Sequence, residues 1–104
     1  MRKIIILTFM SLDGVMQAPG GQDEDFRGGF RFGGWSVPFW DPALAEEMSA
    51  QMAGRFELLL GRRTYDIFHQ SWPNIDPENP TNTMTKYVVT HRVLSPETDI
   101  WKNS

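Results

Sequence analysis

The chain contains three short apolar runs without polar alternation, and these limit its possible folds more than any other feature. They occupy residues 3–10, 56–60 and 86–90. Uninterrupted apolar residues are typical of strands that are covered on both faces, as in a parallel sheet. We therefore expect three buried strands at these positions.

Helical patterns lie between the runs. Asp41-Pro42 is typical of an N-cap followed by proline in the first turn. From Leu44 onward, apolar residues recur at a spacing of four, which predicts an amphipathic helix over residues 42–54 with Met48 and Met52 in the core.

A second, shorter helix should follow residues 61–64 and end at Trp72-Pro73, because proline interrupts helical hydrogen bonding. Residues 74–85 are polar and predict a loop, and residues 99–101 could begin one more element. Alternating strands and helices predict an α/β fold with a mainly parallel sheet and crossover helices. Three strands leave open sheet edges, so we expect residues 1–104 to form one domain that is only part of a larger fold.

Composition excludes several classes of protein. Ten basic and 13 acidic residues give a net charge of -3, whereas nucleic-acid and membrane-surface binders carry a basic excess. The chain has no cysteine and two distant histidines, so neither a thiolate site nor a zinc site is expected. With no apolar run near the roughly 20 residues that span a bilayer, we expect a cytoplasmic protein.

Residues 20–40 combine glycines with six aromatic residues and show no helical or strand period. Long loops inside small domains are commonly functional or disordered, and disordered segments are poor in aromatic residues. Two interpretations stay open: a lid that stacks on a flat heteroaromatic substrate, or a cluster of rings that packs over the sheet.

Basic residues follow two of the expected strands. Gly61-Arg62-Arg63-Thr64 comes after the second strand, and Thr90-His91-Arg92 ends the third. Ligands of open α/β sheets bind beyond the carboxyl ends of the strands, where a helix N-terminus offers free amides to an anion. Guanidinium groups are disfavoured beside that positive end of the helix dipole unless an anion neutralises them. The alternative is that the two arginines are solvated or paired with Asp66 and Glu57.

Three segments together resemble a known superfamily. Residues 58–65, Leu-Leu-Leu-Gly-Arg-Arg-Thr-Tyr, resemble the strand-to-helix turn of dihydrofolate reductases, which contacts the phosphates of NADPH. Residues 8–14, Thr-Phe-Met-Ser-Leu-Asp-Gly, are similar to the opening of the riboflavin-biosynthesis reductase domain, and residues 86–90 resemble the third strand of that superfamily. The resemblance covers essentially the whole chain. It implies a dihydrofolate-reductase-like fold, NADPH as cofactor, and a small heteroaromatic substrate.

The resemblance also implies roles for individual residues. The cofactor phosphates would contact Gly61, Arg62, Arg63 and Thr64, and the adenosine end would contact Thr90 and Arg92. Thr8 and Phe9 would lie near the nicotinamide, whereas Asp13 and Trp40 would form the catalytic, substrate-facing part. Asp13 has an alternative role, because Asp-Gly commonly just turns the chain.

The expected activity is NADPH-dependent hydride transfer to a pteridine-like or ribosylamino-pyrimidine substrate. Dihydrofolate reductase proper binds its pterin through an acidic residue early in the first helix, and an ungapped count places Ala45 there. Asp41 or Glu46 could substitute, but neither matches that position cleanly. Folate itself is therefore not the expected substrate. The alternative function is that of a truncated, inactive fragment, or of a module that pairs its open sheet edge with a second copy. The expected assembly is a homodimer.

Overall fold

The computed structural model describes residues 1–95 and Trp101. The chain forms two compact units, Met1–Ala53 and Gly54–Ser104. The expected element at residues 99–101 lies outside the described residues except for Trp101, which belongs to no helix or strand. None of the helices in the described residues is long and apolar enough to cross a membrane.

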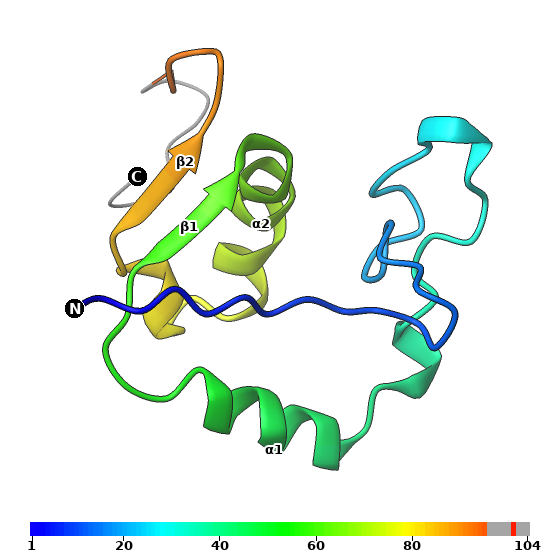
Figure 1. The fold of residues 1–104 in the computed structure, drawn as a ribbon, viewed down its shortest axis with the longest axis horizontal. Helices are drawn as coiled ribbons and strands as arrows, with labels where there is room; N and C mark the ends of the chain where they lie inside the picture. The colour runs from blue at the N-terminus through cyan, green and yellow to red at the C-terminus, as the bar shows by residue number, and fades with distance from the viewer. Residues whose placement is uncertain (96–100, 102–104) are drawn as a thin grey trace. The chain divides into compact units, whose positions relative to one another are not determined.

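The second unit contains a parallel pair of strands and the helix that connects them. Strand β1, Leu58–Gly61, runs into helix α2, Arg62–Ile75, and strand β2 follows at Lys86–Val89 (Figure 1). Leu58 lies opposite Lys86, and Gly61 lies opposite Val89. Parallel strands cannot be joined by a tight hairpin, so α2 forms the crossover. The predicted α/β class with a parallel sheet is confirmed.

The core of this unit lies where α2 packs against the sheet. Tyr65, Leu60 and Trp101 are buried there. Partly buried side chains surround them: Leu58, Phe68, Trp72, Val88 and Leu94. Leu59 is 63% exposed, so β1 buries one face and not both. Within the described part of its own unit, β1 is covered by α2 on one face, so the expectation of a strand covered on both faces was wrong for this unit.

Helix α2 extends past the proline that was expected to end it. It includes Pro73 and ends at Ile75. Proline removes one backbone donor, but the Asp76 N–H still donates to the Trp72 carbonyl at 3.1 Å. The helix therefore loses one hydrogen bond at Pro73 and closes a further turn beyond it. The loop before β2 contains one short 3₁₀ helix, η3, at Pro80–Asn82.

The first unit contains helix α1, Pro42–Gln51, and two short 3₁₀ helices, η1 at Arg27–Gly29 and η2 at Val37–Phe39. The predicted N-cap is confirmed, because the Asp41 carboxylate accepts a hydrogen bond from the Leu44 N–H at 2.8 Å. The helix ends three residues before the expected boundary, short of Gly54, whose φ of +103° is not helical. Met48 and Met52 are half-buried and lie outside the buried cluster, so their placement in the core was wrong.

Residues 3–10 form no strand in the described structure (Figure 1). Ile4, Ile5 and Ile6 are 83%, 87% and 85% exposed. A strand exists only where a neighbouring strand accepts and donates its backbone hydrogen bonds, and no described segment pairs with these residues. The apolar sequence predicts a strand, but it does not say which other strand these residues pair with.

The aromatic segment is a loop closed by hydrogen bonds at its base. The Gly34 N–H donates to the Ala18 carbonyl at 2.8 Å, and the Ser36 N–H donates to the Pro19 carbonyl at 3.1 Å. The Trp35 indole N–H donates to the Gln17 carbonyl at 2.9 Å. These three bonds join residues 17–19 to residues 34–36, so the segment between them forms a closed loop.

Candidate cofactor and substrate site

The carboxyl ends of β1 and β2 lie at the same edge of the sheet. Gly61, the last residue of β1, is also the residue that precedes α2, and no side chain caps the helix there. The first turn of this 14-residue helix therefore presents backbone N–H groups that no side chain of the cap residue satisfies. Such a helix start favours an anionic ligand.

The two arginines occupy the first turn of α2, as expected. Arg62 is about four-fifths buried, and its Nε donates to the Asp66 carboxylate at 2.9 Å. Arg63 and Thr64 are exposed. The alternative interpretation from sequence is thus confirmed for Arg62, which has Asp66 as a partner one turn along the helix.

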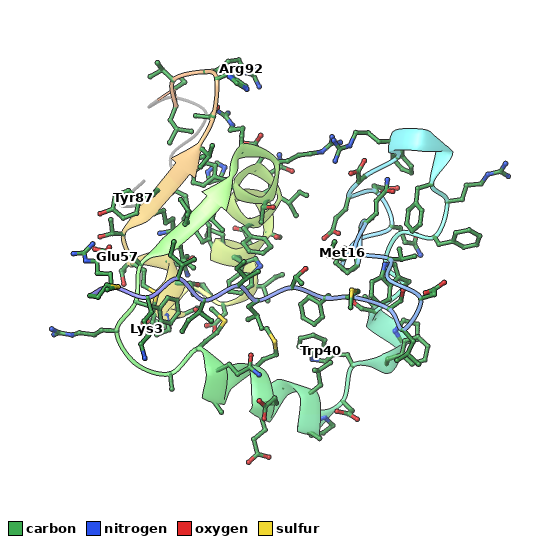
Figure 2. The ribbon with its side chains drawn as sticks, viewed as in Figure 1. Lys3, Met16, Trp40, Glu57, Tyr87 and Arg92 are labelled. Atoms are coloured by element: carbon green, nitrogen blue, oxygen red, sulfur yellow. The ribbon has the colours of Figure 1, made fainter. Side chains whose placement is uncertain are left out.

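Thr90 and Arg92 form a small turn directly after β2. The Thr90 hydroxyl donates to the Arg92 carbonyl at 3.0 Å and accepts from the Arg92 N–H at 3.1 Å. Figure 2 shows Arg92 beyond the end of β2. Because Val89 pairs with Gly61, this turn and the start of α2 follow neighbouring positions at one sheet edge.

Phe9 and Trp40 come together in the first unit, although 31 positions separate them in sequence. Their ring centroids are 5.9 Å apart, with an angle of 49° between the planes. Trp40 is 49% exposed, so part of its ring faces solvent. Thr8 is exposed, and its hydroxyl contacts the Phe9 carbonyl at 3.4 Å. The half-exposed Trp40 ring offers apolar surface of the kind that heteroaromatic rings stack on, with the tilted Phe9 ring beside it.

Asp13 lies in a hydrogen-bonded turn. The Gly14 N–H donates to the Ser11 carbonyl at 3.0 Å, and Gly14 has a φ of +90°. The Ser11 hydroxyl donates to the Asp13 carboxylate at 2.5 Å. Two hydrogen bonds lower the pKa of Asp13 below its ordinary value: the larger effect comes from the Ser11 hydroxyl and the smaller from the backbone N–H of Asp13 itself. Asp13 therefore stands in a turn, and its carboxylate, which is ionised at neutral pH, can accept hydrogen bonds but cannot donate a proton.

The expected site residues thus fall into two groups. One group lies at the sheet edge of the second unit: Gly61, Arg62, Arg63, Thr64, Thr90 and Arg92. The other group lies in the first unit: Thr8, Phe9, Asp13 and Trp40. Within the described residues, no three His, Cys, Asp or Glu side chains are grouped as metal ligands.

Sequence reasoning missed a buried polar cluster beside the core. Lys86 is 3% exposed, and its Nζ donates to the carbonyls of Asn82 and Met84. The same Nζ lies 4.4 Å from the ring centre of Trp101. Burial lowers the pKa of Lys86 to about 8. The only sequence signal was a lysine at the start of an apolar strand, which usually indicates a surface position.

Comparison with known families supports the resemblance. The sequence profile of the family described as RibD C-terminal domain matches residues 2–104. No curated protein sequence matches the chain significantly. The match covers more than half of the chain, and that family has a dihydrofolate-reductase-like α/β fold, in agreement with the parallel strands and crossover helix described above. The chain therefore belongs to the RibD C-terminal domain family.

Proposed function

We propose that this chain belongs to an NADPH-dependent reductase that transfers a hydride to a pteridine-like or ribosylamino-pyrimidine substrate. Membership of a family of riboflavin-biosynthesis-type reductases supports the reaction class. When bound, NADPH supplies the hydride, and the protein has to hold the nicotinamide against the substrate and exclude water. No further catalytic nucleophile is needed for that chemistry.

The observation that carries the proposal is the uncapped start of α2 at the carboxyl edge of the sheet. Arg62 and Arg63 stand in the first helical turn, where the helix dipole disfavours cations by roughly 0.3–1 kcal/mol each. A phosphate at this point would accept hydrogen bonds from the backbone amides and offset the positive charge. The Arg62 side chain is about four-fifths buried whereas Arg63 and Thr64 are exposed, so we assign the larger share of phosphate binding to Arg63 and Thr64.

Gly61 provides a test of fit that does not depend on charge. Its φ of -69° is accessible to any residue, and a Cβ placed there meets no atom within 4 Å. Neither backbone conformation nor internal packing therefore requires glycine at this position. Glycine leaves open space in front of the helix amides, so a phosphate of the ligand could approach these amides closely.

The remaining residues keep the roles that the family resemblance implies for them. Thr90 and Arg92 would bind the adenosine end, because their turn follows β2 at the same edge. Thr8 and Phe9 would lie near the nicotinamide. Trp40 would stack against the substrate beside Phe9, and the ionised Asp13 would accept hydrogen bonds from it. We further propose that the protein is cytoplasmic.

The test is a titration of the protein with NADPH, followed by the fluorescence of the reduced nicotinamide. Replacing both Arg62 and Arg63 with alanine should raise the dissociation constant at least about tenfold, since charge-assisted hydrogen bonds to phosphate are worth roughly 1.5–3 kcal/mol each. Arg55→Ala is the matched control, because this exposed arginine precedes β1 and lies away from the carboxyl edge. Equal affinity of the double variant and the control would contradict the proposal.

A second candidate function, assembly with another copy of the chain, is favoured by one observation. Ile4, Ile5 and Ile6 are all more than four-fifths exposed and have a sequence suited to a strand. An exposed apolar strand is a template for pairing with another chain. Ile5→Lys should then lower the molar mass measured by light scattering, and an unchanged mass would exclude assembly through this segment.

A further inference from the structure

The first unit contains a hollow of about 230 Å³ that the proposed cofactor site does not use. Apolar surface dominates its lining, and its polar lining groups belong to the Ser11–Gly14 turn. The lining residues are Ser11, Asp13, Val15, Phe30, Phe32 and Trp35. The volume is below the roughly 300–1,000 Å³ of pockets for drug-sized ligands, so the hollow suits a small chemical group and not a dinucleotide.

Aromatic rings form the walls of the hollow and stand at an angle to one another. The centroids of Phe30 and Phe32 are 5.8 Å apart, and their planes meet at 75°. Trp35 is held in place by its indole hydrogen bond to the Gln17 carbonyl. Phe32 is 74% exposed, so its ring is accessible to a ligand. Rings that meet nearly at right angles can present their faces to one ligand from two directions.

A negative charge stands beside these rings. The exposed Asp13 carboxylate is ionised at neutral pH, and hydrogen bonds from the Ser11 hydroxyl and from its own backbone N–H lower its pKa further. The Ser11 hydroxyl also accepts a hydrogen bond from the Val15 N–H at 2.9 Å. The hydroxyl therefore acts both as a donor to the Asp13 carboxylate and as an acceptor from the backbone. In the part of the chain that the structure describes, no lysine or arginine forms an ion pair with Asp13.

We propose that this hollow binds the methylated ammonium group of a small organic cation. Ring faces carry negative charge density and attract a cation that lies within about 6 Å. Asp13, which also lines the hollow, adds a full negative charge. A methylated ammonium group suits the site better than a primary one, because its apolar surface packs on rings and it needs few hydrogen-bond acceptors.

The cation site is tested separately from the reductase proposal. It shares Asp13 with the proposed substrate side but uses no residue assigned to NADPH. Binding is measured without NADPH, so its failure would leave the phosphate assignment at Gly61 to Thr64 untouched. Likewise, loss of NADPH binding in the arginine variants would not affect the cation site.

The experiment compares choline with its neutral isostere, in which a carbon atom replaces the quaternary nitrogen. The amide and indole N–H signals of the protein are followed by NMR during each titration. We expect choline to shift the Trp35 indole signal and to bind about 2- to 30-fold more tightly than the isostere, as cation–π energies of roughly 0.5–2 kcal/mol imply. Equal affinity for the two compounds, or no shift at Trp35, would overturn the proposal.

Two variants identify the groups responsible. Phe32→Leu removes an exposed ring and keeps apolar volume, and Asp13→Asn removes the charge; each should weaken choline binding several-fold and leave the weak binding of the isostere nearly unchanged. Asp23→Asn is the control, because this exposed carboxylate does not line the hollow. If the Asp13 variant loses the native NMR spectrum, the Phe32 variant alone decides, and unchanged choline affinity in it would contradict the site.

Discussion

The hydroxyl of Tyr65 accepts a hydrogen bond from the backbone N–H of Trp101 at 3.1 Å. The two residues are 0% and 3% exposed, and their ring centroids are 5.9 Å apart. Tyr65 lies in the first turn of α2, immediately after the residues proposed to bind phosphate. The contact therefore anchors the start of that helix to a residue 36 positions later in the chain.

Tyr65→Phe should destabilise the second unit. The substitution keeps the ring and removes the acceptor of a buried hydrogen bond, which costs about 1 to 2 kcal/mol. The free energy of unfolding from urea titration measures the effect. Tyr87→Phe is the matched control, because Tyr87 is 51% exposed and its hydroxyl can bond to water. Equal stability of the two variants would show that the buried contact contributes nothing.

Lys86 should make stability depend on pH. Burial lowers its pKa from 10.5 to about 8 in the folded chain. Between these values the unfolded chain binds a proton that the folded chain has lost, so the free energy of unfolding rises as pH rises from about 8 to 10.5 and falls as pH decreases through that range. Lys86→Met removes the titrating group and should flatten this slope. Urea midpoints of both proteins, measured across the range, test the difference. If the two proteins gave parallel curves of urea midpoint against pH, the pH dependence would come from groups other than Lys86.

Gly61→Ala should separate folding from ligand binding. A Cβ at this position meets no atom within 4 Å, and φ is -69°, so we expect the urea midpoint to change little. The methyl group would occupy the space before the helix amides, and the dissociation constant for NADPH should rise several-fold. Unchanged affinity in a stable variant would place the phosphates elsewhere.

The sequence predicted the second unit well because its signals are local. The run that forms β1 and the glycine and arginines after it each depend on neighbouring residues. The same holds in the first unit for the Asp41-Pro42 helix start. Local patterns also predicted which residues stand at the carboxyl edge, since that position follows from strand order.

The remaining features depend on distant partners. No neighbouring residue indicates whether another strand pairs with residues 3–10, and these residues form no strand in the structure. The burial of Lys86 depends on Trp101 and on carbonyls of the preceding loop. The hollow beside Asp13 depends on rings of residues 30–35, whose sequence has no period from which a contact could be inferred.

Gly33→Ala should open the aromatic loop and abolish the hollow beside Asp13. A Cβ at Gly33 would lie 2.3 Å from the carbonyl oxygen of Gln22, a backbone atom that cannot move without displacing the chain. The displacement would act on the neighbouring Trp35, so its indole hydrogen bond to Gln17 should weaken and the indole N–H should exchange faster with solvent. Gly21→Ala is the control in the same loop, because its nearest neighbour is the Glu24 side chain, which can rotate away. Equal indole exchange rates in the two variants would mean that the close approach at Gly33 does not hold the loop closed.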